Sequence, residues 1–192
     1  MIHNVAIFAS GSGSNAENLI HHFKNHPSIN IVHIFCNNPN AFVIKRAPKL
    51  NVPITIFNKE DFYTSNIVLN KLIELSIDFI VLAGFLWLIP KKMVESYPNK
   101  IINIHPALLP KYGGKGMYGA KVHEAVVANN ETESGITIHY VNEHYDEGNI
   151  IFQAQVPLLR TDTAEQVAAK VHDLEYKYFP SEVEKCILSN YL

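Results

Sequence analysis

Asn103 and His105 lie two positions apart at the end of an apolar run that stops at Pro106. Because alternate residues of a strand point to the same face, both side chains would meet at the strand's C-terminal end, where open α/β sheets bind ligands. An amide N–H and an imidazole are suitable donors to an oxyanion on a carbonyl under attack, and the imidazole can carry a proton near neutral pH. The pair therefore indicates acyl transfer. The alternative is a turn-forming Asn beside a His bonded to a backbone carbonyl.

A glycine-rich loop, SGSGSNA at residues 10–16, is the second stretch with chemical meaning. It lies between an apolar run and a helical pattern, so it matches the dinucleotide fingerprint G-x-G-x-x-A. That fingerprint is usually joined by an acid about 20 residues later, whereas residues 35–40 read FCNNPN, with no Asp, Glu or Arg. We therefore favour a helix N-terminus that receives one phosphate. The alternatives are a nicotinamide or flavin dinucleotide site and a plain Gly/Ser turn.

Short apolar runs alternate with segments of helical spacing over the first half of the chain. The expected strands are residues 4–9, 29–36, 53–57, 78–83 and 101–104, and the expected helices are residues 16–25, 41–50, 68–75 and 90–97. Pro90 suits the first turn of the last of these helices. Strands that are buried on both faces read as continuous apolar runs, so this alternation predicts a mostly parallel sheet with helices on both sides.

The pattern changes after Gly119. A helix to about residue 129 is followed by apolar runs at 135–141 and 150–157, whose closeness around a turn with Asp146 and Gly148 predicts an antiparallel pair. Asp162 or Thr163 would cap a last amphipathic helix. The expected fold class is α/β: a mostly parallel twisted sheet flanked by helices, with an antiparallel pair near the C-terminal end.

Composition limits the classes of function. With 192 residues, 47% hydrophobic and 18% charged, and no linker or repeat, the chain is expected to form one domain over residues 1–192. A net charge of −2 gives no broad attraction to nucleic acid or a membrane, so the expected partners are small molecules, and a homodimer is left open. The apolar run at 5–9 is too short for a signal peptide or membrane span, which predicts a cytoplasmic protein. Ten histidines and two cysteines show no metal-ligand spacing, so no metal is expected.

Four motifs occur in collinear order: SGSGSN after the first strand, LAGFLWLIP at 82–90, INIHPALLP at 102–110 and YDEGNIIFQ at 145–153. With them the chain resembles the phosphoribosylglycinamide formyltransferases of the folate-dependent formyltransferase family over nearly its whole length. The resemblance implies a Rossmann-like formyltransferase fold and a catalytic set of Asn103, His105 and Asp146. Two related branches fit less well. The chain ends too early for the RNA-binding domain of methionyl-tRNA formyltransferases, and its first strand begins too near Met1 for the extra domain of formyltetrahydrofolate deformylases.

The resemblance also implies binding roles, carried over position by position. Substrate phosphate would be held by Gly13, Ser14 and Asn15. Glu175 would contact the rest of that substrate, and its alternative is a charge on the exposed face of a terminal helix. Folate would be walled by the loop at residues 85–89 together with the strand end, that is by Leu86, Trp87, Leu88, Ile89 and Asn103.

The implied reaction is transfer of a formyl group from the co-substrate 10-formyltetrahydrofolate to the primary amine of 5'-phosphoribosylglycinamide, a step of purine biosynthesis. Asn103 and protonated His105 would stabilise the oxyanion, and Asp146, if it lies near His105, would raise the pKa of that imidazole. The alternative for Asp146 is a turn cap. Two other functions remain open: a related folate enzyme that uses another acceptor or water, and a non-catalytic domain that binds a phosphorylated metabolite.

The chain departs from the family pattern at several positions. Trp87 stands where the family commonly has Arg, Ala107 where it has Ser, and Glu147 where a small residue is usual. The loop GGKGMYG at residues 113–119 is unusual and is interpreted as an insertion. We assign no role to Lys115 of this loop, which reads equally as a solvated charge, or to Lys59.

Overall fold

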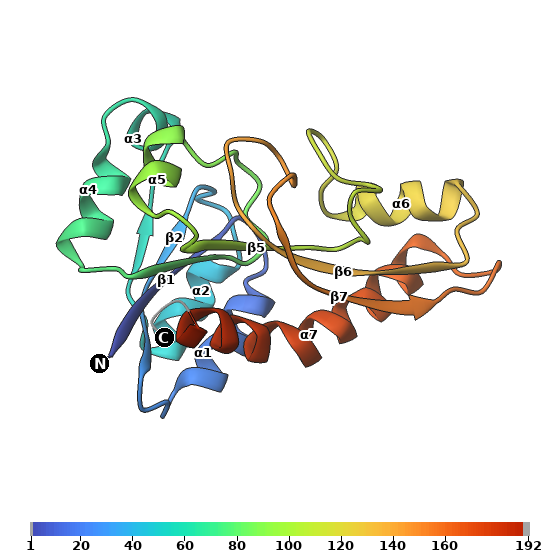
Figure 1. The fold of residues 1–192 in the computed structure, drawn as a ribbon, viewed down its shortest axis with the longest axis horizontal. Helices are drawn as coiled ribbons and strands as arrows, with labels where there is room; N and C mark the ends of the chain where they lie inside the picture. The colour runs from blue at the N-terminus through green and yellow to red at the C-terminus, as the bar shows by residue number, and fades with distance from the viewer. Residues whose placement is uncertain (1, 190–192) are drawn as a thin grey trace.

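The structure is a computed structural model, and it describes residues 2–189. In chain order its elements are β1 (His3–Ala9), α1 (Ser14–Phe23), β2 (Ile29–Cys36), α2 (Val43–Arg46), the 3-10 helix η1 (Ala47–Leu50), β3 (Ile54–Ile56), α3 (Lys59–Tyr63), α4 (Ile67–Glu74), β4 (Phe79–Leu82), α5 (Lys91–Ser96), β5 (Ile101–His105), α6 (Ala120–Ala128), β6 (Glu133–Tyr140), β7 (Ile150–Pro157) and α7 (Ala164–Ser189). Figure 1 shows α1 and α7 on one side of the strands and α3 to α5 on the other.

One sheet contains all seven strands of the described chain, in the order β3-β2-β1-β4-β5-β6-β7. The pairs from β3 to β5 are parallel, and β5-β6 and β6-β7 are antiparallel. The predicted fold class is therefore confirmed. Because β1 lies between β2 and β4, the connections that leave β1 and β4 diverge at a topological switch point. Ligands of open α/β sheets bind in the crevice at such a point.

The two faces of the sheet bury separate hydrophobic clusters. Val5, Ile7 and Ala9 of β1 pack with residues of α1 and α7, and Ala6 and Phe8 face an aromatic-rich cluster below α3 to α5. Both sets are fully buried, so β1 has the continuous apolar sequence expected of a central parallel strand.

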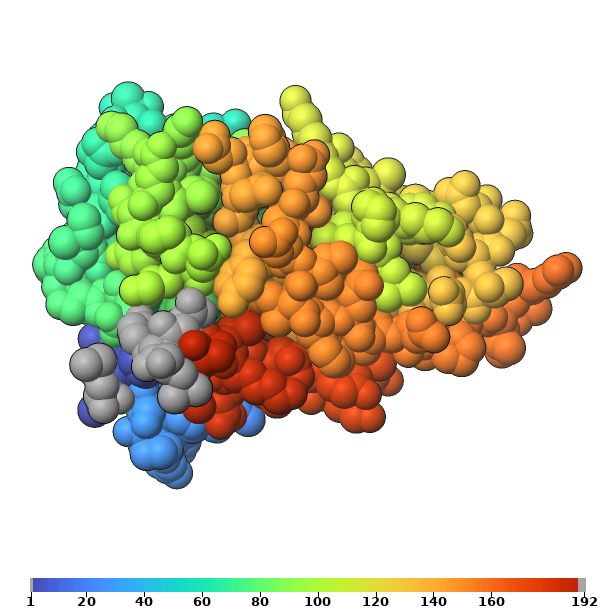
Figure 2. Space-filling view, viewed as in Figure 1, coloured from blue at the N-terminus to red at the C-terminus, as the bar shows by residue number. Residues whose placement is uncertain are grey.

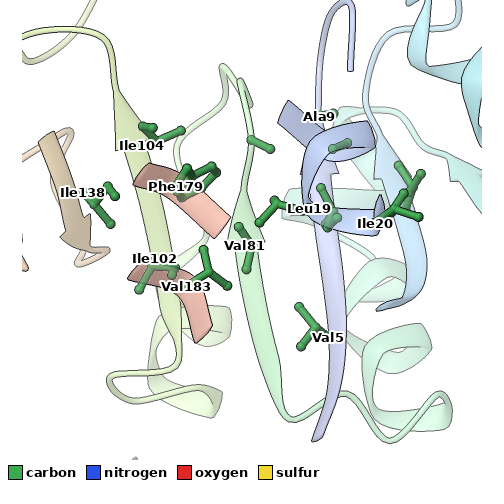
Figure 3. Packing of buried hydrophobic residues seen from close by; sticks show 14 of the residues in the cluster. Val5, Ala9, Leu19, Ile20, Val81, Ile102, Ile104, Ile138, Phe179 and Val183 are labelled. Carbon is green, nitrogen blue, oxygen red and sulfur yellow. The ribbon is translucent and has the colours of Figure 1, made fainter. Parts of the chain in front are cut away.

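The same alternation fixes the direction of the polar residues in β5. Ile102 and Ile104 belong to the α7 side of the core, and Figure 3 shows Phe179 of α7 beside Ile104. Because successive strand residues point to opposite faces, Asn103 and His105 share the other face. The core thus holds the two polar side chains at the C-terminal end of β5.

The helices differ from the prediction in three places. The helix expected at 41–50 is split into α2 and η1 at Pro48, which cannot donate the backbone hydrogen bond of a continuous helix. The short helix α3 was not predicted, although Asn58 and Asp61 form a capping box at its start. Pro90 is the N-cap of α5 rather than a residue of its first turn. The last helix continues through Pro180 to Ser189.

Candidate active site

A cavity of about 650 Å³ lies at the carboxyl ends of β1, β4 and β5. Its walls come from the glycine-rich loop, the connection after β4, the end of β5, the loop at residues 113–119, the start of α6, the segment before β7 and one residue of α7. In Figures 1 and 2 the yellow-green loop after β5 and the orange segment between β6 and β7 stand out at one edge of the molecule. The cavity is therefore formed mainly by connections, which an ordered sheet places around one crevice.

Asn103 lies opposite His139 in the antiparallel register of β5 and β6. Its Nδ2 atom is 3.1 Å from His139 Nε2 and 3.5 Å from Asp146 Oδ1. His139 Nδ1 lies 2.8 Å from the carbonyl oxygen of Tyr140, and a carbonyl can only accept, so the ring proton is on Nδ1. His139 Nε2 is then an acceptor for the Asn103 amide. The histidine orients this amide and determines which side of it carries the N–H donors.

His105 is buried, with 4% of its surface exposed. Its Nε2–H donates to the carbonyl oxygen of Tyr112 at 2.7 Å, which leaves Nδ1 facing Asp146 Oδ2 at 3.5 Å. Burial lowers the pKa of His105 below its ordinary value, and the raising effects of the Asp146 carboxylate and the Tyr112 carbonyl do not offset it. The Asp146 carboxylate thus acts on this pKa in the predicted direction, and burial outweighs it. Without ligands, His105 is mainly neutral at neutral pH.

Asp146 is held by the loop that follows β5. Its Oδ2 atom accepts a hydrogen bond from the Gly114 backbone N–H at 3.0 Å, and its backbone has a positive φ of 56°, which Asp tolerates better than most residues. Burial by itself would raise the pKa of this carboxyl, but His139, His105 and the Gly114 N–H together bring it below the ordinary value. The carboxylate stays charged at neutral pH beside both imidazoles.

The glycine-rich loop forms the start of α1 as the sequence predicts. Gly13 is the N-cap residue at φ 74°, and a Cβ at this position would lie 2.5 Å from Val43 Cγ2, so only glycine fits. Arg46 Nε donates to the Ser12 carbonyl at 2.9 Å and fixes the outer side of the loop. The Ser14 N–H donates a long hydrogen bond of 3.4 Å to Ser12 Oγ, which a stronger anionic acceptor at the start of α1 would replace.

Glu175 faces the cavity and is not an exposed helix charge. Its Oε2 atom accepts hydrogen bonds from Asn15 Nδ2 at 2.9 Å and from His172 Nδ1 at 3.0 Å, and the carboxylate raises the pKa of His172. The Asn15 side-chain amide thus donates to Glu175, and only the backbone N–H of Asn15 is available to a phosphate.

The connection between β4 and α5 forms an apolar wall. Trp87 packs edge-on against Phe57 and near-parallel to Tyr63, with ring centroids 5.9 and 6.1 Å apart. Lys59 Nζ lies 5.9 Å from the centre of the Trp87 ring. The Tyr63 hydroxyl donates to the Leu88 carbonyl at 2.9 Å. These contacts hold the wall in place, and the cavity is lined here by Phe85, Leu86, Trp87, Leu88 and Ile89.

The sequence and the fold both match known proteins. Residues 3–183 match the family described as formyl transferase. The chain belongs to this family. A formyl transferase named phosphoribosylglycinamide formyltransferase, from Haemophilus influenzae, is 33% identical over 92% of this chain and 83% of its own. A chloroplastic protein of the same name from Arabidopsis thaliana is 39% identical over 91% of this chain and 62% of its own.

Solved formyl transferases agree with the fold. The glycinamide ribonucleotide transformylase 1 of Geobacillus kaustophilus superposes with a TM-score of 0.86 at 32% identity, over 95% of this chain and 97% of that chain. The chain spans about 60% of the length of the two plant relatives. In residues 2–189 we find no helix that is both long and apolar enough for a membrane span, and no group of three His, Cys, Asp or Glu suited to a metal ion.

The structure brings together every site residue that the sequence predicts: Asn103, His105, Asp146, Gly13, Ser14, Asn15, Glu175 and residues 86–89 line one cavity. Sequence reasoning missed His139, His123 and the two backbone groups of the loop, the Tyr112 carbonyl and the Gly114 N–H. His139 had a signal, because it alternates with apolar residues in β6. The pairing of His139 with Asn103 had none.

Proposed function

We propose that this formyl transferase moves a formyl group from 10-formyltetrahydrofolate to the primary amine of 5'-phosphoribosylglycinamide. The observation that carries the proposal is one cavity that combines a phosphate-type helix N-terminus with the Asn103, His105 and Asp146 constellation. Two bacterial relatives are named phosphoribosylglycinamide formyltransferase, which supports the choice of acceptor. A pure binding domain would have no need for a buried histidine and carboxylate beside an oriented amide.

The phosphorylated acceptor would occupy the side of the cavity between α1 and α7. The N–H groups of Ser14 and Asn15 and the positive end of the α1 dipole would receive the phosphate. Glu175, fixed by Asn15 and His172, would contact the part of the acceptor between its phosphate and its amine. The acceptor's amine would then reach toward His105.

The folate co-substrate would lie against the wall formed by residues 85–89. Leu86, Leu88 and Ile89 offer apolar contact and backbone hydrogen-bonding groups, and Trp87 adds an aromatic surface. Trp87 also borders a second hollow that contains Lys59, so an extended ligand could pass the ring. The formyl carbon would be placed near Asn103, which belongs to both the folate wall and the catalytic set.

Catalysis would depend on how well these residues stabilise the negative charge that develops on the formyl oxygen. The second N–H of the Asn103 amide, which makes a long hydrogen bond of 3.5 Å to Asp146 Oδ1, would donate to the oxyanion as the amine attacks. Donors of this kind contribute about a hundred- to thousandfold in rate. His105 Nδ1, opposite the Asp146 carboxylate, is the site where a proton would be held and passed to the departing folate nitrogen. Holding both substrates in one cavity supplies the remaining acceleration through proximity.

Two broader expectations remain part of the proposal. We propose one domain over residues 1–192 and action on small molecules in the cytoplasm, without a metal ion and without a nucleic-acid or membrane partner. The two plant relatives are described as chloroplastic, so location is a separate question from chemistry. A homodimer would be compatible with this chemistry.

Incubation of the purified protein with 10-formyltetrahydrofolate, with and without 5'-phosphoribosylglycinamide, tests the proposal. We expect tetrahydrofolate to appear only when the acceptor is present. Equal release without acceptor would indicate a hydrolase. Release only with some other amine would indicate a different acceptor, and no release with any acceptor would favour a binding domain.

A further inference from the structure

His123 is a buried histidine whose role the proposed mechanism leaves open. It lies near the start of α6, directly after the loop at residues 113–119, and only 7% of its surface is exposed. The residue lines the same cavity as Asn103 and His105. Its Nδ1 atom is buried and has no hydrogen-bond partner. A buried polar atom without a partner costs free energy, so a rotation of the imidazole ring that turns this nitrogen toward a ligand in the cavity gains binding.

The other histidines of the cavity are already committed or exposed. His105 uses Nε2 on the Tyr112 carbonyl and presents Nδ1 to Asp146. His139 uses both ring nitrogens, on Asn103 and on its own neighbour's carbonyl. His144 is exposed. Of the three buried cavity histidines, only His123 therefore has an unpaired ring nitrogen.

The position of His123 relates it to the acceptor's path. Glu175 of α7 and His105 of β5 line the same cavity and are near enough to shift the pKa of this imidazole. In the proposed function the acceptor runs from the start of α1, past Glu175, to the catalytic end of β5. An imidazole whose pKa responds to both Glu175 and His105 lies beside the last part of this path, where the nucleophilic amine must be.

The imidazole of His123 is uncharged at neutral pH. Burial lowers its pKa below the ordinary value, and the raising effect of Glu175 is smaller. The positive end of the α6 dipole acts in the same direction as burial. A neutral imidazole can accept an N–H hydrogen bond, whereas an imidazolium cannot accept one and would repel an ammonium group.

We propose that His123 binds the nucleophilic end of the acceptor: its unpaired ring nitrogen accepts a hydrogen bond from the primary amine and directs the nitrogen lone pair toward the formyl carbon. This inference rests on the proposed function and extends it with a residue that positions the amine for attack. His123 touches the substrate but exchanges no covalent bond with it.

The test compares three variants by steady-state kinetics with 5'-phosphoribosylglycinamide and 10-formyltetrahydrofolate. His123→Phe keeps the ring and removes the acceptor nitrogen, and we expect kcat/KM for the acceptor to fall roughly ten- to a hundredfold, because a partner is lost at a buried site. KM for the folate should stay within about twofold, since the folate wall is untouched. His123→Gln keeps a hydrogen-bonding group and should recover part of the loss.

His33→Gln is the matched control. His33 is equally buried, also has an unpartnered Nδ1 and a pKa lowered by burial, but it lies outside the cavity and bonds Thr55. It should lower the melting temperature without a change in acceptor KM. If the kinetic loss came only from placing glutamine at a buried histidine position, it would appear in His33→Gln as well as in His123→Gln.

The pH profile separates a binding role from a structural one. In the wild type, acceptor KM should rise as pH falls through the His123 pKa, because the imidazole becomes charged. In His123→Gln this component should vanish, although His105 remains in the cavity. Unchanged acceptor kinetics in the folded His123→Phe protein, or equal losses for both substrates, would overturn the inference while leaving the proposed function intact. Absence of any formyl transfer by the wild type would overturn both.

Discussion

Replacing Asn103 with alanine tests the oxyanion donor that the structure orients most clearly. The variant loses the amide N–H that would face the formyl oxygen, and removing such a donor lowers turnover by about a hundred- to thousandfold, equal to about 2.7–4 kcal/mol of transition-state stabilisation. Binding of the phosphorylated acceptor should change little, because the α1 end of the cavity is untouched. The expected kinetic result is therefore a loss in kcat with acceptor KM nearly constant.

The stability cost of Asn103→Ala follows from the same contact. His139 Nε2 loses its 3.1 Å partner and is buried, which generally costs about 1–3 kcal/mol. Because the site borders the cavity, water can replace part of the lost partner, so we expect the lower half of that range. For a chain of this size this corresponds to a fall in melting temperature of roughly 2–8 °C.

Single-turnover and steady-state assays together with a thermal melt separate these effects. Asn129→Ala is the control, since Asn129 bonds the Ala125 carbonyl at the end of α6 away from the cavity. It should leave turnover unchanged. His139→Ala should lower turnover by less than Asn103→Ala, and the double variant should not lose the product of both factors. Turnover of folded Asn103→Ala within tenfold of the wild type would refute the oxyanion role.

Three further substitutions probe other walls of the cavity. Gly13→Ala should raise acceptor KM and lower stability by about 1–3 kcal/mol, because the new Cβ meets Val43 at a positive φ, and a thermal melt with acceptor titration measures both. Asp146→Asn should cut turnover by about a hundredfold or more. The carboxylate raises the pKa of His105, so its loss lowers that pKa further; NMR titration of His105 checks this, and an unchanged pKa would leave Asp146 a turn residue. The pKa of Asp146 is lower in the folded state than in the unfolded state, so its carboxylate stabilises the fold at pH above the unfolded-state pKa. This stabilisation is lost as pH falls through the folded-state pKa. Thermal melts of Asp146→Asn at acid pH should not show this loss of stability. Trp87→Ala should weaken folate binding measured by calorimetry and leave acceptor binding unchanged; lost thermal stability with unaltered folate affinity would make the ring purely structural.

Local patterns predicted much of the fold because they express local physics. The continuous apolar runs of β1 and β4 require burial on both faces, and that requirement alone implies helices on both sides of a parallel sheet. The two-residue spacing of Asn103 and His105 gave their shared face for the same reason. Local capping would also have found α3, since Asn58 and Asp61 form its capping box.

Nonlocal contacts explain what the sequence could not supply. Asn15 and Glu175 are 160 positions apart, and their hydrogen bond reassigns the Asn15 side chain from phosphate to carboxylate. The pairing of Asn103 with His139 depends on the register of β5 and β6. The lowered pKa of His105 also depends on nonlocal structure. The sequence motif predicts the nearby Asp146 carboxylate, but the burial that outweighs its effect is produced by the whole fold.

The most direct test of the account follows the formyl carbon itself. The protein is mixed with 10-formyltetrahydrofolate labelled with ¹³C in the formyl group and with unlabelled 5'-phosphoribosylglycinamide, and the products are resolved by NMR and mass spectrometry. We expect the label to appear as a formamide on the acceptor's primary amine, in equal amount to the tetrahydrofolate formed. Label recovered as free formate, or retained on the folate while the acceptor stays bound and unmodified, would contradict it.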